Sequence, residues 1–277
     1  MNSFLFIIPC TPAKHQNKTR KALWRLCLET LIKQTHNNWK ALIIGVDINF
    51  EVNDSRFITI PYEGPKEEKL QKATEYIISN NILGDYIIRL DDDDIINPNI
   101  LKKISTLDFD LYVDKFQWFW HYESGKKSYK IWYWYPNTCI HKRMHALTFW
   151  GDFAIGDFQK FRNKAMLIEN NHTLIHPYYT DKNVMLATKK HPIYLRSITN
   201  SSITALYSPK NIKEYYKRFG YWKKRHLQDF TFLYEKELKS VDSKFPKLSL
   251  WEKIENIVFN FRCSRAYMKV MGKSEIF

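Results

Sequence analysis

Four consecutive aspartates, Asp91 to Asp94, directly follow an apolar run that ends at Leu90. Adjacent carboxylates repel one another and are costly to desolvate, so such a run at the end of a buried strand indicates a nearby cation. Oxygen ligands suit a hard metal, Mg²⁺ or Mn²⁺, which in turn suits a substrate that carries phosphate. The alternative is a helix cap, in which Asp94 or Asn97 precedes a helix starting at Pro98. A cap explains one or two of the acids but not four.

The four aspartates are expected to have different roles at the site. If the chain leaves the strand in an extended conformation, Asp91 and Asp93 point to the same side, about 7 Å apart. These two are the predicted pair that faces the metal and the substrate. Asp92 faces away from the pair and is assigned to the nucleotide-binding set, and Asp94 is predicted to support the site from behind or to cap a helix.

The first half of the chain alternates strand patterns with helix patterns. Continuous apolar runs are typical of strands covered on both faces, and apolar residues at helical spacing mark the segments between them. The predicted strands span 4–8, 39–46, 56–60 and 86–90, and the predicted helices span 19–34 and 67–78. This alternation with short turns predicts an α/β fold with a mostly parallel sheet and flanking helices.

Polar residues follow three of these strands at the edge where ligands bind. In an open α/β sheet, ligands lie outside the carboxyl ends of the strands. Pro9 and Thr11 leave the first predicted strand, Asp47 leaves the second, and the aspartates leave the fourth. Their clustering predicts a nucleotide cleft. The chain has only 8 Gly, and it contains neither a P-loop nor a dinucleotide fingerprint.

The second half of the chain changes character. Segments 113–122 and 129–135 flank a turn at 123–127 and read as a β-hairpin with aromatic side chains on both faces. Two interpretations stay open: cross-strand aromatic packing, or a wall on which a sugar stacks. Helices are predicted near 158–170 and 182–190, and a strand near 193–198.

Charge and cysteine usage restrict the partners. The formal net charge is +14, and residues 210–277 hold 16 Lys+Arg against 8 Asp+Glu, more than half of that excess. This basic, aromatic tail is interpreted either as a surface-binding segment on an anionic membrane or as a segment that packs on the catalytic domain. The 4 Cys are widely spaced, so we expect free thiols rather than zinc or disulfides. With no signal or transmembrane pattern, the protein is expected to be cytoplasmic, either free or peripheral on the inner face of the cell membrane.

Several of these segments together resemble a known enzyme family. The residues are Ile7 to Pro9, Leu31 to Trp39, Leu42 to Asp47, and Leu90 to Asp94 followed by Pro98. They are similar to the nucleotide-sugar half of family 2 glycosyltransferases of the GT-A fold, over about residues 1 to 115. The run that begins at Arg89 is especially similar to bacterial proteins described as rhamnosyltransferases. The resemblance implies an inverting transfer of a sugar from a UDP-, dTDP- or GDP-linked donor to a hydroxyl of a glycan or lipid-linked acceptor, in bacterial surface polysaccharide assembly.

The resemblance also implies roles for single residues. Asp91 and Asp93 become the metal-diphosphate motif, with Asp93 the direct ligand of Mn²⁺ or Mg²⁺. Asp47 becomes the carboxylate on the base or ribose, and Pro9 and Thr11 match the first nucleotide loop. The family's acidic pattern after the second strand is absent from residues 45–50, which leaves the nucleotide undecided.

The general base for the acceptor hydroxyl is expected in the second half of the chain, on the opposite face of the sugar. Asp181, before the predicted helix 182–190, fits the family's acidic residue at a helix start. A plain helix N-cap explains Asp181 nearly as well. Asp152 and Asp157, in loops expected near the acceptor, are the other candidates.

The resemblance divides the chain into a catalytic domain, 1–208, and a basic helical extension, 209–277. The catalytic domain has a nucleotide-sugar half, 1–115, and an acceptor half, 116–208. The main alternative function is a metal-dependent phosphodiesterase or nuclease, which shares the carboxylates and the positive charge. A binding module without catalysis would explain the aromatics but not the aspartates. No nucleic-acid partner is expected under the first interpretation.

Overall fold

The computed structural model describes residues 1–45, 53–122, 124–131, 136, 138–148, 175, 178–199, 219, 222–223, 225–233, 254 and 258. The helices are α1 (Lys18–Ile32), α2 (Lys66–Ser79), α3 (Ile100–Ile104) and α4 (Arg143–Ala146). The strands are β1 (Phe4–Pro9), β2 (Trp39–Ile44), β3 (Phe57–Ile60), β4 (Tyr86–Arg89), β5 (Ile95–Ile96), β6 (Leu111–Asp114), β7 (Phe116–His121), β8 (Lys127–Ile131), β9 (Ile140–Lys142), β10 (Val184–Ala187) and β11 (Tyr194–Ile198).

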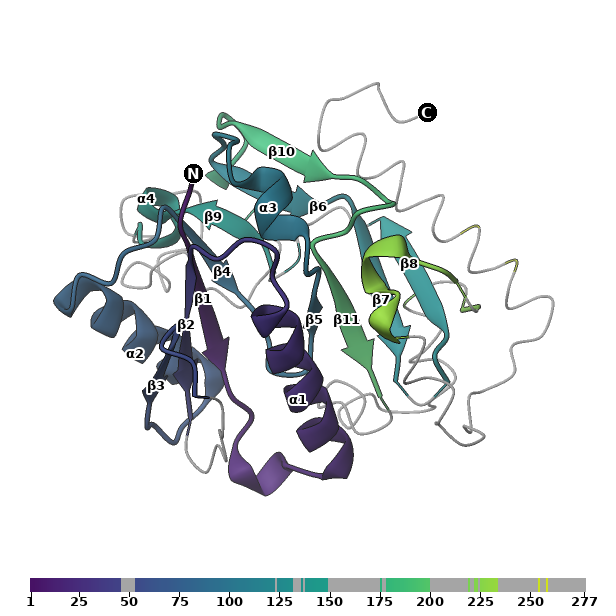
Figure 1. Ribbon diagram of the computed structural model, residues 1–277, viewed down its shortest axis with the longest axis horizontal. Coiled ribbons are helices and arrows are strands. Elements are labelled where there is room, and N and C mark those ends of the chain that lie inside the picture. Colours follow the sequence, from purple (N-terminus) through teal and green to yellow (C-terminus); the bar gives the residue numbers. More distant parts are fainter. Residues whose placement is uncertain are drawn as a thin grey trace.

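Within the described residues, the main sheet has seven strands in the order β10-β6-β9-β4-β1-β2-β3 (Figure 1). All neighbours pair in parallel except at β9, which is antiparallel to both β4 and β6. The chain runs from β1 outward to β2 and β3, and then crosses back to place β4 on the other side of β1. The strand order therefore reverses between β1 and β4, which is where ligands bind in sheets of this type. The predicted α/β fold with a mostly parallel sheet is confirmed.

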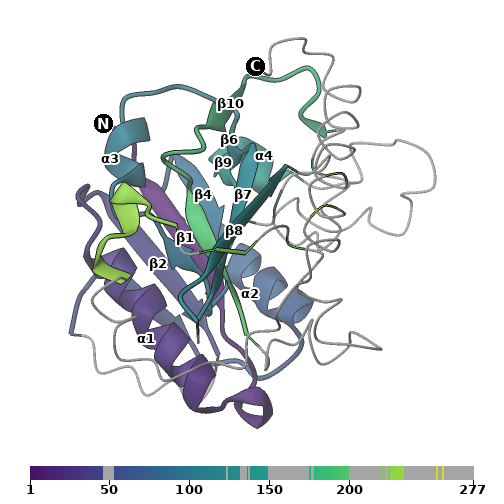
Figure 2. The ribbon, with the colours of Figure 1, turned by 90° about the vertical axis from the view of Figure 1, so that its right-hand side faces the viewer.

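The two long helices cover opposite faces of this sheet (Figure 2). Because successive side chains of a strand point to opposite faces, β1 divides its residues between the helices. Phe6 packs in one core cluster with Leu31 of α1, and Leu5 packs in another with Leu70 of α2. The side chain of Asn17 caps α1 by accepting from the backbone N–H of Arg20 at 2.9 Å. The sheet thus holds the starts of both helices close to its carboxyl edge.

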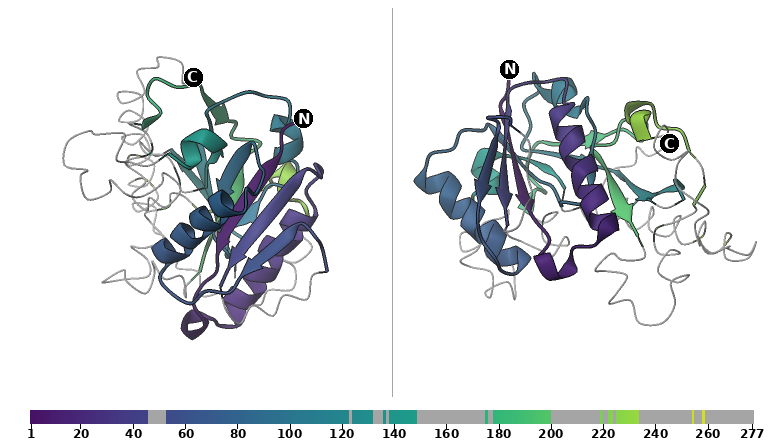
Figure 3. Two further views of the ribbon diagram at one scale, coloured as in Figure 1. Left: turned by 90° about the vertical axis from the view of Figure 1, so that its left-hand side faces the viewer. Right: turned by 60° about the horizontal axis from the view of Figure 1, so that its bottom comes forward.

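A second sheet lies beyond α1, in the order β5-β11-β7-β8 (Figure 3). The hairpin β7–β8 is antiparallel as predicted, and Gly125 in its turn takes a φ of 64°, a conformation that favours glycine. Trp118 and Trp120 are buried against Leu227 and Phe230. For these two tryptophans, packing rather than an open stacking wall is the correct interpretation.

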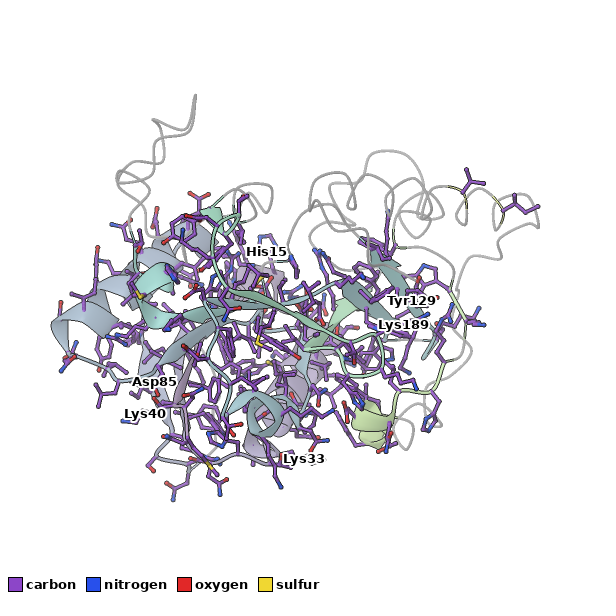
Figure 4. The ribbon with its side chains drawn as sticks, turned by 90° about the horizontal axis from the view of Figure 1, so that it is seen from above. His15, Lys33, Lys40, Asp85, Tyr129 and Lys189 are labelled. Atoms are coloured by element: carbon purple, nitrogen blue, oxygen red, sulfur yellow. The ribbon has the colours of Figure 1, made fainter. Side chains whose placement is uncertain are left out.

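Tyr129 of β8 is also engaged by the protein itself (Figure 4). Lys189, which follows β10, donates to its hydroxyl at 2.7 Å and lies 3.9 Å from its ring centroid. The ring is therefore partly covered by a cation–π contact. Residues 132–135, the other aromatic arm of the predicted hairpin, lie outside the described residues.

The largest error of the sequence prediction falls at 182–190. This segment forms strand β10, paired in parallel with β6, and not a helix. Its apolar core is only four residues, Val184–Ala187, and periodicity does not separate a buried strand from a helix over so short a run. The helix predicted at 158–170 lies outside the described residues.

Part of the basic tail packs on the core of the described fold. Phe219 and Trp222 are buried, and Lys223 pairs with Lys127 at the start of β8 through backbone hydrogen bonds of 2.8 and 3.1 Å. These aromatic side chains are packed on the protein, as one of the two interpretations of the tail expected. Among the described residues, no helix combines the length and the apolar character needed to span a membrane.

Candidate functional site

The four aspartates form a turn at the carboxyl end of β4. The backbone N–H of Asp94 donates to the carbonyl of Asp91 at 3.0 Å, so the run is folded back and the expected extended exit is wrong. Burial alternates along the turn: Asp92 and Asp94 are buried, whereas the side chains of Asp91 and Asp93 keep 26% and 17% of their surface exposed. Asp91 and Asp93 are therefore the two carboxylates that a ligand at this edge can reach.

Asp92 joins the two strands at the point where the strand order reverses. Its Oδ2 accepts from the backbone N–H of Thr11 at 2.7 Å, and its Oδ1 accepts from the Thr11 hydroxyl at 2.9 Å. Thr11 lies in the loop after β1. Asp92 was expected to face away from the site; instead it fixes the first loop against the turn after β4.

Arg20, in the first turn of α1, spans the same gap. Its guanidinium contacts Asp92 at 3.2 Å and Asp93 at 3.0 Å, and it also donates to the Thr11 hydroxyl. The side chain is only 7% exposed. Its Nε is buried and has no hydrogen-bond partner among the residues that the structure describes. A buried guanidinium with an unused donor is suited to an anionic group.

Helix α2 contributes two lysines one turn apart. The Nζ of Lys66 lies 2.6 Å from both carboxylate oxygens of Asp91. The Nζ of Lys69, which is 1% exposed, donates to the carbonyl of Cys10 at 2.8 Å and so supports the first loop from beneath. The Nε of Arg89 is 3.9 Å from Asp91. The cation that the aspartate run predicted is thus supplied, in part, by the protein's own side chains.

The surroundings separate the pKa values of the aspartates. Burial raises the pKa of Asp91, but Lys66 and Arg89 outweigh it and hold that pKa below its ordinary value. Burial, together with Asp92 and Asp91, raises the pKa of Asp93 to about 6 against the effect of Arg20. Burial and the neighbouring carboxylates raise the pKa of Asp94 as well. Carboxylates with separated pKa values in one cleft are typical of functional sites.

Asp94 supports the turn rather than capping a helix. Its Oδ1 accepts from the backbone N–H of Ser197 on β11 at 3.0 Å, which ties the turn to the second sheet. Helix α3 begins at Ile100, and its N-cap residue Asn99 makes no side-chain cap. The Asn97 side chain, the other candidate, accepts from the backbone N–H of Asn99 at 2.9 Å just before the helix. The capping interpretation of Asp94 is therefore wrong, and the supporting role is the one observed.

The residues present fit a divalent metal only in a limited way. In the part of the chain that the structure describes, no three His, Cys, Asp or Glu side chains gather as a metal site. Asp91 and Asp93 offer two hard oxygen ligands at most. This fits Mg²⁺ or Mn²⁺ in the mode in which one or two carboxylates hold the ion and substrate phosphates complete its shell.

The other predicted residues divide into two groups. Pro9 is the last residue of β1 and starts the loop that carries Thr11, so both lie at the site. Asp181 does not: it precedes β10, which runs parallel to β6, and it therefore lies at the amino edge of the sheet. Its side chain is 82% exposed and pairs with Lys182. The positions predicted at Asp47, Asp152 and Asp157 lie outside the described residues.

The sequence prediction missed Arg20, Lys66 and Lys69. One signal was present: Lys66 and Lys69 are three residues apart, so they share a helix face in the first turn of α2, and this face contacts Asp91 and the Cys10 carbonyl.

Comparisons with known proteins give low similarity throughout. No protein-family profile matches the chain, and no curated protein matches its sequence. The solved structures with a similar backbone include TarS 1-349 of S. aureus, with 13% sequence identity and a TM-score of 0.43. That match covers 70% of this chain and 60% of the TarS chain. The same protein in complex with UDP-GlcNAc gives 11% identity and a TM-score of 0.46, over 96% of this chain and 73% of that one. The apo form of the glycosyltransferase GlyE from Streptococcus pneumoniae TIGR4 gives 12% identity and a TM-score of 0.41, over 88% and 65%. The fold described above rests on the strand pairing of this chain alone.

Proposed function

We propose that the protein is a glycosyltransferase that moves a sugar from a nucleoside-diphosphate sugar to a hydroxyl of a glycan or lipid-linked acceptor. The observation that carries the proposal is the Thr11–Asp92 bridge across the strand-order reversal, with reachable carboxylates and basic side chains packed around it. A nucleotide binds at this place in sheets of this type. The sequence resemblance of residues 1–115 to family 2 glycosyltransferases supports the same conclusion.

The side chains suit a diphosphate. Arg20 presents a buried guanidinium next to the reachable carboxylates, and Arg–phosphate pairs are strong because the guanidinium offers a fork of donors. Lys66 offers a flexible point charge at Asp91. A divalent metal, when bound, supplies further neutralisation of the charge that develops on the diphosphate as it leaves.

The loop geometry is fixed before the substrate arrives. Asp92 holds Thr11 through two hydrogen bonds, and Lys69 holds the Cys10 carbonyl. Groups held in place in advance need no reorganisation during the reaction, which is how electrostatic stabilisation lowers a barrier. These residues position the site.

The general base on the acceptor side is narrowed to two candidates rather than assigned to one residue. Inversion requires a base on the face of the sugar opposite the leaving group. Asp152 and Asp157 remain the proposed candidates for that base. Asp181 is no longer one, because it lies at the other edge of the sheet. We also propose that residues 1–208 form the catalytic domain and that the enzyme acts in surface polysaccharide assembly, with the inner face of the membrane as the place of work.

A metal-dependent phosphodiesterase is the competing function. Such enzymes gather carboxylates and histidines from separate segments around two metal ions. The described residues contain no such gathering, and the reachable acids that they place at the carboxyl edge after β4 come from one turn.

Thermal unfolding in the presence of Mn²⁺ and each of UDP, dTDP and GDP tests the proposal. A ligand at a hundred times its dissociation constant stabilises the folded state by about 2.7 kcal/mol, which raises the unfolding temperature by several degrees. We expect one of the nucleotides to do so with the wild type and not with Asp93→Ala. No response to any nucleotide, together with tight DNA binding, would contradict the proposed function.

A further inference from the structure

Lys66 occupies an unusual electrostatic position. It is the first residue of α2, where the helix dipole disfavours positive charge, and the acids Glu67 and Glu68 follow it in the same turn. Its Nζ is equidistant, at 2.6 Å, from the two oxygens of Asp91. A carboxylate that binds a metal ion in the bidentate mode also places both of its oxygens on one cation. Lys66 thus serves as a counter-cation for Asp91 that the chain carries with it.

Lys66 and Arg20 differ in how firmly they are held. Arg20 is 7% exposed and contacts Thr11, Asp92 and Asp93 at once. The Lys66 side chain is 37% exposed, and its hydrogen bonds within the described residues go to Asp91 alone. Lysine carries its charge on a flexible four-carbon stem, whereas the guanidinium of arginine is held by its geometry. Lys66 is the cation that can leave the carboxylates; Arg20 is not.

We propose that a divalent metal displaces Lys66 from Asp91 and that the freed ammonium binds the diphosphate of the donor. The proposal rests on the proposed function, because it names how the same site takes its two ligands. Asp91 would hold the metal with the same oxygens that now bind the Lys66 ammonium, so the two cations would compete for it. The exchange leaves every charge paired: the metal on the carboxylates, and Lys66 on the phosphate that arrives with the nucleotide.

The exchange makes metal and nucleotide dependent on each other. Metal alone must expel Lys66 with no new partner for it, so metal alone binds weakly. Nucleoside diphosphate alone meets carboxylates that still hold Lys66. When both are present, each provides what the other needs, and the binding of one strengthens the binding of the other by the same factor.

Calorimetric titration of the wild type and Lys66→Met with MnCl₂ alone, UDP (or the nucleotide that stabilises the protein) alone, and the two together tests the exchange. For Lys66→Met we expect Mn²⁺ alone to bind about fivefold more tightly, the factor that corresponds to roughly 1 kcal/mol for a partly exposed ion pair. We expect the Mn²⁺–nucleotide combination to bind about fivefold more weakly, because the phosphate loses its ammonium. The opposite signs separate this role from a structural one, which would weaken both.

The matched control is Lys72→Met, on the same helix. Lys72 pairs with Glu75 at 2.9 Å on the exposed side, so its loss should change neither titration. Lys66→Arg, which keeps the charge, should restore tight binding of the Mn²⁺–nucleotide combination.

An unchanged or weaker affinity of Lys66→Met for Mn²⁺ alone overturns the exchange, and so does an absence of Mn²⁺ binding by both proteins at millimolar concentrations. A different result would show that the proposed function itself is wrong. That result is a wild type that binds no nucleoside diphosphate, while the titration with MnCl₂ alone still decides whether Lys66 competes with the metal.

Discussion

The aspartates at the two edges of the main sheet differ in their hydrogen-bond and ion-pair partners. At the amino edge, each aspartate has its own partner: Asp85 accepts from the backbone and hydroxyl of Ser3 at 2.7 and 2.8 Å (its place is labelled in Figure 4), and Asp108 pairs with Lys142 at 2.8 Å. The Ser3 N–H lowers the pKa of Asp85, and Lys142 lowers that of Asp108. These are ordinary carboxylates that tie loops together.

At the carboxyl edge, neighbouring carboxylates share their partners, and their pKa values move apart, with Asp91 held low and Asp93 and Asp94 raised. Their basic partners come from separate elements, Arg20 from α1 and Lys66 from α2. The number of acids does not separate the two edges, since both are acidic. What separates the edges is that buried like charges crowd together at the carboxyl edge and are paired with basic side chains from other elements of the fold.

The largest expected difference between the edges is in catalysis. Asp91→Ala and Asp93→Ala should each lower the rate of donor hydrolysis or sugar transfer by roughly a hundredfold or more, since each removes charge stabilisation at the diphosphate. Asp181→Asn and Asp108→Ala, at the amino edge, should leave the rate unchanged. The rates are measured with the nucleotide sugar whose nucleotide stabilises the protein. A loss of activity in Asp181→Asn would return that residue to the site and contradict the topology.

The next difference is in stability. Asp92→Ala leaves the buried Arg20 with one carboxylate fewer and releases Thr11, so the free energy of unfolding should fall by about 3 kcal/mol. Denaturant unfolding measures this change. Asp108→Ala removes an exposed pair at the opposite edge and should have little measurable effect. Equal effects of the two substitutions would show that the bridge at Asp92 is no stronger than a surface contact.

The last difference concerns the dependence of stability on pH. Burial raises the pKa of Asp114, at the end of β6, to about 8, although N–H groups of Ile193 and Tyr194 act in the opposite direction. The folded state therefore keeps a proton that the unfolded chain has lost above the ordinary carboxyl pKa. In that window, stability decreases as pH rises, by at most about 1.4 kcal/mol per pH unit, until the folded pKa is passed.

Asp114→Asn removes this proton linkage. Denaturant unfolding between about pH 5 and about pH 8 should show a flatter stability profile for the variant than for the wild type. A profile of equal slope would assign the pH dependence to other groups.

Much of the fold of residues 1–115 was predictable because its signals are local. The apolar runs of β1, β2 and β4 mark buried strands, and the predicted ends fall within two residues of those observed. The position of the aspartates then follows from the rule for parallel sheets. The reversal between β1 and β4 did not follow from any local pattern, since it depends on which side of β1 the chain returns to.

The misses have physical reasons. Arg20 and Lys66 are two among 43 basic residues, and nothing local tells which side chain turns toward a carboxylate from a distant segment. Asp181 was misplaced because a short apolar run fits a helix and a strand equally, and the choice between them moves the residue from one edge of the sheet to the other. The folded-back turn at Asp91 to Asp94 was missed because a polar run gives no signal for its own conformation.

The bridge between Thr11 and Asp92 also bears on how the protein folds. The two residues are separated by 81 positions in sequence, and α1, β2, β3, α2 and β4 lie between them. Closing so long a loop costs chain entropy that is recovered only once the intervening strands have paired. We therefore expect the bridge to form only after β1 and β4 have paired, so that the candidate site depends on the long-range assembly of the sheet rather than on any local element.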